Sequence, residues 1–327
     1  MTDPEPIACL GAGRMGCGIA VVWAYAGHPV KLVDFKERSE DDFRTLKAGA
    51  LNGIRGVLSN LSGFGMFDAA RIDTIMSRVG IVSRQEAKDA LSSAALIIEA
   101  LPEVLDIKRG ALASASALAG PSPIIASTTS TILVDDLSSA VSQPERFLNA
   151  HWLNPAYLMP LVEMSPGKKT DPAVTARLKK MLETIGKMPV ICAASPGYIV
   201  PRIQTLAMNE AARLVEQGVA SAEDIDKATK YGLGFRFAVL GVLEFIDWGG
   251  GDTLFYASRD LARELNSPCY ASPDIIDSNM AQGRIGLKTK RGFLDYEGMD
   301  INAYRDERLK AFVAMLRHLD LVKPPVV

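Results

Sequence analysis

Cysteine and histidine are scarce in this chain of 327 residues, which contains four cysteines and three histidines. The cysteines are scattered and form no C-x-x-C pair, so the pattern predicts neither a disulfide framework nor a structural zinc site. No group of histidine, cysteine and carboxylate residues has the spacing of metal ligands, and we expect no bound metal. We therefore expect the four cysteines to be reduced thiols, as in a cytoplasm. They are Cys9, Cys17, Cys192 and Cys269.

An excess of charge of either sign is also missing. The chain has 36 Lys and Arg residues against 38 Asp and Glu residues, a formal net charge of −2. This balance argues against the broad basic surface that binds nucleic acid or an anionic membrane. The apolar runs are too short to span a bilayer, and the acidic start Met1–Pro6 does not fit a signal peptide. We therefore expect a cytoplasmic protein whose partners include neither nucleic acid nor membrane.

Three glycines near the start of the chain have a spacing that predicts a binding function. Residues 7–16 read Ile-Ala-Cys-Leu-Gly-Ala-Gly-Arg-Met-Gly, a short apolar strand followed by G-x-G-x-x-G. Gly11 permits the tight turn out of the strand, Gly13 lets a pyrophosphate approach the backbone, and Gly16 lets the next helix pack on the sheet. The free N–H groups at the helix N-terminus favour phosphate. This segment therefore predicts a bound dinucleotide.

A second apolar run, Lys31–Asp34, ends in an acid and completes the dinucleotide-binding βαβ pattern. Asp34 is spaced to accept the hydroxyls of the adenosine ribose. We expect NAD rather than NADP because a 2′-phosphate would meet this negative charge. Lys36 and Arg38 lie just beyond and could weaken that preference.

Strand and helix patterns alternate as far as about residue 190. The segment 38–78 is helical in character and is interrupted by Gly63 and Gly65, and Asp171 and Pro172 form a cap and first turn of a helix. This alternation predicts an α/β domain over residues 1–193, a Rossmann-like doubly wound parallel sheet. The short apolar runs that predict its later strands are Leu96–Ala100, Ile124–Ser127, Pro160–Met164 and Pro189–Cys192.

Beyond Ser195–Gly197 the pattern becomes helical. One apolar stripe runs from Ile203 to Val215 and ends at Gly218, and Ser221 is placed to cap the next helix. We therefore expect an all-helical C-terminal domain over residues 194–327 that binds substrate. Its stripes are apolar enough to suggest a homodimer, although such stripes also become buried within a single chain.

One histidine stands in a chemically suggestive context. His151 is followed by the turn Asn154–Pro155 and, twelve residues on, by Glu163 in a strand-like run. An imidazole titrates near neutral pH, and a carboxylate can orient it and stabilise its protonated form, so the pair suits proton abstraction. A lone histidine is also compatible with a structural role.

Six segments, in this order, resemble the 3-hydroxyacyl-CoA dehydrogenase family over nearly the whole chain. The resemblance implies oxidation of a C3 hydroxyl with hydride transfer to nicotinamide. The segments are Gly11–Gly16; Glu99–Glu103 with Lys108; Ala126–Ser130; His151–Glu163; Pro196–Val200; and Lys288–Phe293.

The same resemblance implies roles for individual residues. His151 would be the general base and Glu163 its orienting partner, Ser130 would hydrogen-bond the substrate oxygen, and Asn154 would hold substrate and histidine. Each of these residues also has a structural alternative: Ser130 would be a helix cap, Asn154 a turn residue and Lys108 a solvated charge. The cofactor contacts implied are Gly11, Ala12, Gly13, Arg14, Met15, Gly16, Asp34, Ala100, Glu103 and Lys108.

Two departures from the family pattern concern the substrate. The family usually places an active-site Asn where this chain has Pro201. The segment Gly232–Gly241 is longer than in acyl-CoA members, carries Arg236, and looks like relatives that act on free acids: carnitine dehydrogenase, a lambda-crystallin-related gulonate dehydrogenase and a dehydrogenase of pyridine carboxylates. An arginine binds a carboxylate in bidentate fashion, although Arg236 could instead form a surface or inter-subunit ion pair.

The helical segment before the third strand agrees with a free acid. CoA-binding members tend to carry lysines there, whereas Asn52–Ala70 of this chain has only Arg55 as a cation.

These departures favour a free L-3-hydroxy acid as substrate, with Arg236 binding its carboxylate. The same reaction on an (S)-3-hydroxyacyl-CoA such as 3-hydroxybutyryl-CoA is the alternative. A non-catalytic, crystallin-like NAD-binding protein is a more distant one.

Overall fold

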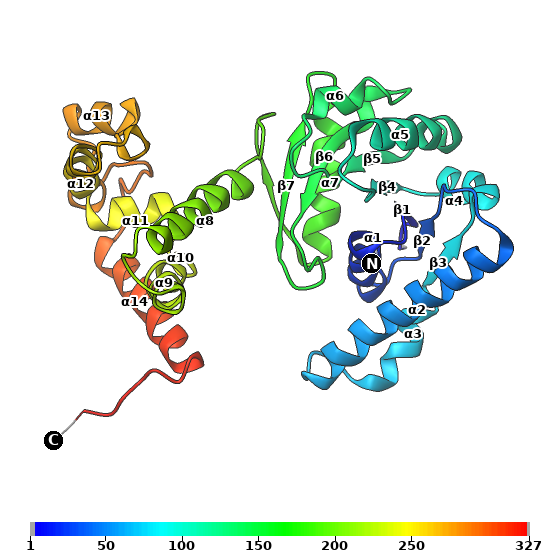
Figure 1. Ribbon diagram of the computed structural model, residues 1–327, viewed down its shortest axis with the longest axis horizontal. Helices are drawn as coiled ribbons and strands as arrows, with labels where there is room; N and C mark the ends of the chain where they lie inside the picture. The colour runs from blue at the N-terminus through cyan, green and yellow to red at the C-terminus, as the bar shows by residue number, and fades with distance from the viewer. Residues whose placement is uncertain (1–3, 326–327) are drawn as a thin grey trace. The chain divides into compact units, whose positions relative to one another are not determined.

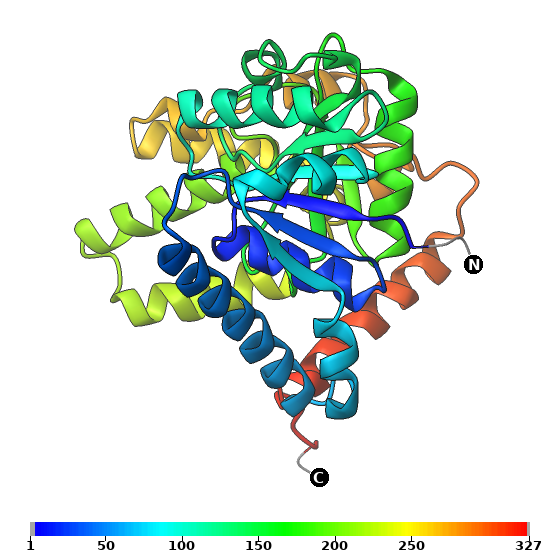
Figure 2. The same ribbon diagram turned by 90° about the vertical axis from the view of Figure 1, so that its right-hand side faces the viewer.

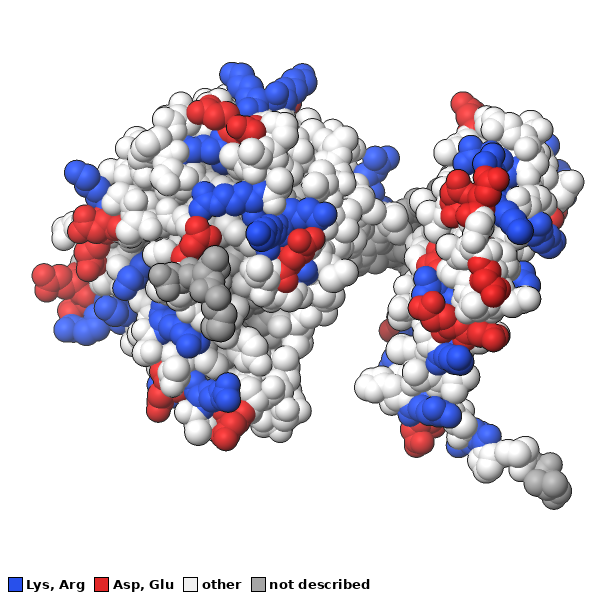
Figure 3. All heavy atoms as spheres, turned by 180° about the vertical axis from the view of Figure 1, so that it is seen from behind, with Lys and Arg blue, Asp and Glu red and all other residues white. Residues whose placement is uncertain are grey.

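The computed structural model describes residues 4–325, so the first three residues of the acidic start Met1–Pro6 lie outside the described part. The chain divides into two compact units, Met1–Ala207 and Met208–Val327, and each is described by itself. Within residues 4–325, none of the helices combines the length and apolar character needed to cross a membrane. Basic and acidic side chains are interspersed on the face shown in Figure 3.

The first unit is built on an eight-stranded sheet with the order β3-β2-β1-β4-β5-β6-β7-β8 (Figure 1). All neighbouring strands are parallel except β6 and β7, which are antiparallel. The prediction of a mostly parallel Rossmann-like sheet is confirmed, and the reversal at β7 is an addition to it. The strands are β1 (Ile7–Leu10), β2 (Val30–Val33), β3 (Val79–Val82), β4 (Leu96–Glu99), β5 (Ile124–Ser127), β6 (Phe147–Trp152), β7 (Leu161–Pro166) and β8 (Met188–Ile191).

Helices cover both faces of this sheet (Figure 2). Alternate residues of a strand point to opposite faces, and in β1 Ile7 and Cys9 join one apolar cluster while Ala8 and Leu10 join the other. The first cluster also contains Trp23, and its helices are α1 (Arg14–Tyr25), α2 (Glu40–Gly63), α3 (Ile72–Met76) and α7 (Pro172–Thr184). The second is covered by α4 (Ala87–Ser92), α5 (Leu105–Ala119) and α6 (Val134–Ser138).

The predicted helical segment between β2 and β3 forms as expected. The Ser39 hydroxyl accepts a hydrogen bond from the Asp42 N–H and so caps α2. The helix ends at Gly63, and Gly65 follows with φ +80°, a left-handed conformation that favours glycine. A short 3₁₀ turn and α3 then lead into β3.

The second unit is helical, as predicted: its described residues contain no named strand. The long helix α8 (Val200–Glu216) begins in the first unit, and the Ser221 hydroxyl accepts the Asp224 N–H at the start of α9. A π-helix, Thr229–Gly234, joins α9 to α10. The helices are α9 (Ala222–Ala228), α10 (Phe235–Phe237), α11 (Val242–Gly249), α12 (Gly251–Glu264), α13 (Asp274–Ala281) and α14 (Ile301–His318).

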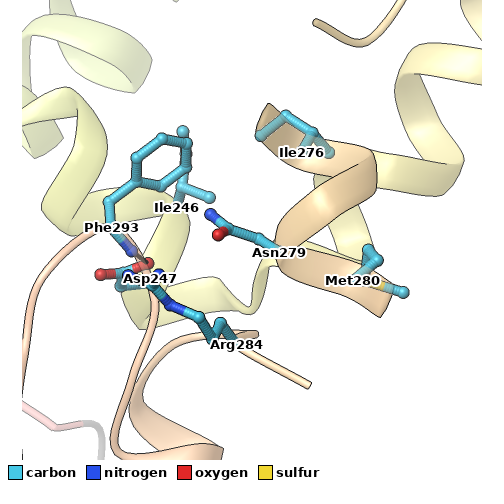
Figure 4. A pocket seen from close by; sticks show the side chains of 8 residues that line it. Ile246, Asp247, Ile276, Asn279, Met280, Arg284 and Phe293 are labelled. Carbon is cyan, nitrogen blue, oxygen red and sulfur yellow. Dashed lines mark hydrogen bonds between the residues drawn. The ribbon is translucent and has the colours of Figure 1, made fainter. Parts of the chain in front are cut away.

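A buried carboxylate organises the segment Lys288–Phe293 that the sequence singled out. Asp247 on α11 accepts hydrogen bonds from the N–H groups of Phe293 (2.9 Å) and Leu294 (2.8 Å) and from the Tyr296 hydroxyl (3.2 Å). Asp247 points at the Phe293 backbone in Figure 4. The hollow beside it is very small, so these contacts indicate a structural role for the segment.

Candidate active site

The glycine turn lies where the sheet order changes direction. β1 is flanked by β2 and β4, so the chain leaves β1 toward one side of the sheet and later returns to the other. Such a switch point at the carboxyl ends of the strands is where α/β sheets bind ligands. Gly11 has φ +100°, and a Cβ on Gly16 would lie 2.1 Å from the Gly11 carbonyl oxygen.

The start of α1 is free to receive phosphate. Gly13 is its N-cap without a side-chain cap, and a Cβ built there would meet nothing within 4 Å. The first N–H groups of a helix have no partner within the helix, so those of Arg14, Met15 and Gly16 are available to an anion. Ala12 is half-buried beside them. This cradle fits a pyrophosphate.

Asp34 follows β2 at the same edge of the sheet. It is 6% exposed and accepts a hydrogen bond from Arg38 Nε at 2.5 Å. It also lines a hollow of about 750 Å³, with Leu101 and residues of α5 on the other side. A ribose and adenine fit a mostly apolar hollow of this kind, with Asp34 as acceptor for hydroxyls.

His151 and Glu163 lie opposite one another in the antiparallel pair of β6 and β7. Both are buried, and Nδ1 of His151 lies 2.7 Å from Oε2 of Glu163. The other oxygen, Oε1, accepts the N–H groups of Ile199 (2.9 Å) and Val200 (2.8 Å). A carboxylate with three such neighbours acts as acceptor, so Nδ1 carries the proton and Nε2 keeps a free lone pair.

Ser130 lies in a loop that Glu103 organises. Oε1 of Glu103 accepts the N–H groups of Ser130 (2.9 Å) and Thr131 (3.0 Å) and the hydroxyl of Thr129 (2.5 Å). Burial alone would raise the pKa of Glu103, but the Thr129 hydroxyl, the charge of Lys108 and the backbone N–H groups hold this pKa below its usual value. The cap of α6 is Leu133, so Ser130 is not a helix cap.

Lys108 is not a solvated charge: its side chain is 1% exposed. Its ammonium group donates to both oxygens of Glu99 (2.9 and 3.0 Å) and to the Leu101 carbonyl (3.1 Å), and it lies 3.4 Å from Glu103 Oε2. Lys108 therefore holds together the loop after β4 that begins at Ala100. A direct contact with the cofactor stays a prediction.

Asn154 is exposed in the connection between β6 and β7. Lys187 fixes this connection: its ammonium group donates to the carbonyls of Ala156 (2.6 Å) and Met159 (2.7 Å) and lies 5.3 Å from the centre of the Trp152 ring. The sequence pattern did not reveal Lys187, because its partners lie about thirty residues earlier.

Tyr198 was also missed as a site residue, although it lies in the quoted segment Pro196–Val200. Its ring stacks on His151 with centroids 5.3 Å apart and planes 19° apart. Its hydroxyl donates to the Thr129 carbonyl (3.0 Å) and accepts from Asn149 Nδ2 (2.9 Å). An aromatic residue directly after Pro-Gly is the only local signal for this role.

The predicted carboxylate anchor lies outside the first unit. Arg236 belongs to the second unit, on α10, where its guanidinium lies 5.2 Å from the Phe245 ring centre. It has no carboxylate partner among residues 4–325, so the ion-pair alternative finds no support within the chain. Pro201 is the second residue of α8, where a missing N–H costs nothing.

Comparisons with known proteins agree with this geometry. Residues 6–195 match the "3-hydroxyacyl-CoA dehydrogenase, NAD binding domain" and residues 197–296 match the corresponding C-terminal domain. The chain belongs to the 3-hydroxyacyl-CoA dehydrogenase family. It is therefore an NAD-dependent oxidoreductase that acts on a CH–OH group, and the predictions of family and cofactor are confirmed.

Three relatives illustrate the range of this family. A 5-formyl-3-hydroxy-2-methylpyridine 4-carboxylate 5-dehydrogenase of Mesorhizobium japonicum is 31% identical over 96% of this chain and 98% of its own length. A 3-hydroxybutyryl-CoA dehydrogenase of Bradyrhizobium diazoefficiens is 34% identical over 90% and 96%. The crystal structure of a 3-hydroxyacyl-CoA dehydrogenase from Archaeoglobus fulgidus gives a TM-score of 0.75 at 29% identity, covering 97% of this chain and 100% of that one.

Two glycine substitutions separate folding from cofactor binding. Gly16→Ala places a methyl group against backbone and should lower the free energy of unfolding by about 3 kcal/mol or more. Gly13→Ala meets no atom of the protein, so it should cost less than about 1 kcal/mol yet weaken NAD binding at least tenfold. Urea unfolding and NADH fluorescence titration measure the two effects. Equal NAD affinity in wild type and Gly13→Ala would contradict the phosphate site.

Lys187 predicts a pH-dependent stability. Burial lowers its pKa to about 8 from 10.5, so between these values the unfolded chain binds more protons and the free energy of unfolding rises with pH. The difference between wild type and Lys187→Met should therefore grow above pH 8, by up to about 3 kcal/mol. Urea unfolding of both proteins at pH 7, 8, 9 and 10 measures it. A constant difference would show that Lys187 stays charged throughout.

Proposed function

We propose that this protein oxidises the C3 hydroxyl of a free L-3-hydroxy acid to the 3-keto acid. The observation that carries the proposal is the buried pair of His151 and Glu163 at 2.7 Å. His151 Nε2 takes the proton of the substrate hydroxyl, and Glu163 stabilises the imidazolium that forms. NAD, when bound, accepts the hydride from C3. Ser130 hydrogen-bonds the substrate oxygen.

The residues that hold the cofactor follow from the same edge of the sheet. The N–H groups at the glycine turn Gly11–Gly16 bind the pyrophosphate, and Asp34 accepts the ribose hydroxyls. Ala100 and Glu103, in the loop after β4, contact the nicotinamide end of the cofactor, and Lys108 of α5 acts through the carbonyl and carboxylates that it holds. Asn154, on the connection after His151, contacts the substrate from the other side.

Three observations support a free acid over a thioester. Arg55, the only cation of Asn52–Ala70, is 2.8 Å from Asp73 and is thus occupied within the chain. Arg236 is exposed on α10 without a carboxylate partner among the described residues, which suits an anchor for the acid. The Mesorhizobium relative is named for a pyridine carboxylate.

The second candidate is the same reaction on an (S)-3-hydroxyacyl-CoA such as 3-hydroxybutyryl-CoA. It is favoured by the Bradyrhizobium relative, which is named for that activity. The non-catalytic alternative has less support, because a protein without turnover has no need of a buried acid–base pair.

We also propose a domain boundary, a location and an oligomeric state. We place the domain boundary at residues 193 and 194, and we expect a cytoplasmic homodimer formed through the second unit. Large apolar side chains there are about half exposed and would be covered by a second copy; among them are Leu243, Leu261, Leu309 and Val313.

Removal of the base tests the reaction. His151→Ala should lower kcat/KM by about 100-fold to 10,000-fold, the range of general-base catalysis, and leave the Kd of NADH within twofold. Glu163→Gln should also lower kcat/KM, because a neutral amide cannot stabilise the imidazolium. The exposed His318→Ala is the matched control and should keep full activity. Full activity of His151→Ala would overturn the proposal.

A substrate panel distinguishes the two candidates. NADH formation is measured with 3-hydroxybutyrate, carnitine, gulonate and 3-hydroxybutyryl-CoA. We expect a free acid to give the highest kcat/KM, and Arg236→Met to lower that value about 10-fold to 100-fold through loss of a charge-assisted hydrogen bond. Turnover of the thioester alone, unchanged in Arg236→Met, would reject the free acid and establish the alternative.

A further inference from the structure

We propose that Tyr198 is a positioning residue: its ring fixes the plane of the His151 imidazole, and its hydroxyl fixes the Ser130 loop relative to that imidazole. The inference rests on the proposed function of His151 as general base. Tyr198 does not touch the reacting atoms in this scheme, and it acts through the groups that do.

The backbone at Tyr198 is held in a sparsely populated conformation. Gly197 has φ +72° and Tyr198 has φ +44°, so two successive residues are left-handed, the second with a bulky side chain. Such a conformation costs free energy and persists where surrounding contacts determine it. Here it directs the ring back onto β6 while the next two N–H groups, of Ile199 and Val200, reach Glu163.

The ring supplies a constraint that Glu163 cannot. A single hydrogen bond at Nδ1 fixes one point of the imidazole but lets the ring rock about the Nδ1–Oε2 direction. The Tyr198 ring lies nearly parallel to the imidazole, offset from it with 5.3 Å between centroids, and limits this rocking on one side. The bond and the stacked ring together fix the direction in which Nε2 points.

The hydroxyl supplies the second constraint. The loop that carries Ser130 is held at Thr129, whose carbonyl accepts from the Tyr198 hydroxyl, and at Ile132, whose carbonyl accepts from Asn149 Nδ2 at 3.0 Å. Asn149 also donates to Tyr198, at 2.9 Å, and lies two residues before His151 on the same face of β6. Tyr198 therefore bridges the strand of the base to the loop of Ser130.

The hydroxyl keeps its proton in this setting. Burial raises the pKa of Tyr198, outweighing the opposing effect of the Asn149 hydrogen bond. The hydroxyl consequently donates to Thr129 over the whole pH range in which a histidine base operates. The bridge between Tyr198 and Thr129 therefore persists over this whole pH range.

Two variants of Tyr198 separate the contribution of its ring to kcat from that of its hydroxyl. Tyr198→Phe keeps the ring and should lower kcat about 10-fold, with the Kd of NADH unchanged. Tyr198→Leu removes both and should lower kcat a further 10-fold. The matched control is Tyr296→Phe, which deletes another buried hydroxyl, the one that donates to Asp247. It should change stability as much as Tyr198→Phe does and leave kcat unaltered.

A readout independent of turnover comes from ¹⁵N-histidine NMR, which is simple because the chain has three histidines. The Nδ1–H signal of His151, assigned by its loss in His151→Ala, should be sharp in wild type and Tyr198→Phe and broadened in Tyr198→Leu. An unchanged kcat in Tyr198→Phe, or an unchanged signal in Tyr198→Leu, would overturn the inference. If the signal responds while no panel substrate is oxidised, positioning stands and the proposed function fails.

Discussion

The carboxylate of Glu163 accepts three hydrogen bonds, and the arrangement of the site depends on all of them. One holds the His151 imidazole, and two hold the backbone at the start of α8, so a single buried charge joins two strands and a helix. A buried charge is tolerated only when it is fully hydrogen-bonded, which is why its partners must lie close together. The antiparallel pairing of β6 and β7 makes this possible, because it places residues twelve positions apart directly opposite one another.

The same rule governs the neighbouring part of the site. Glu99 is buried and is neutralised by Lys108, while Ser127 donates to it at 2.5 Å. Glu103 accepts hydrogen bonds from two N–H groups of the loop that carries Ser130. Glu99 at the end of β4 and Glu103 in the loop after it thus have partners on β5 and on the loop that follows β5. The groups are fixed before any ligand arrives, which is the arrangement that electrostatic stabilisation of a reaction requires.

The features that could be predicted from the sequence are those with a local pattern. The glycine turn, the strands β4, β5, β7 and β8, the cap at Ser221 and the His151–Glu163 pair all depend on short spacings or apolar runs. The strands β3 and β6 were not recognised, and the direction of β7 leaves no trace in its periodicity. Tyr198 and Lys187 were missed because their contacts join residues that are distant in the chain; the Tyr198 hydroxyl reaches back 69 residues to Thr129.

The position of Pro201 explains how substrate preference can change while the base is retained. A proline in the first turn of a helix needs no hydrogen-bond partner, and its neighbours Ile199 and Val200 already donate to Glu163. The exchange of a family asparagine for Pro201 therefore removes a polar contact without disturbing the start of α8 or the carboxylate that orients His151. The proposed acid–base pair lies within the first unit, whereas the proposed carboxylate anchor, Arg236, belongs to the second. Because these contacts share no residue, the substrate can diverge without loss of the reaction.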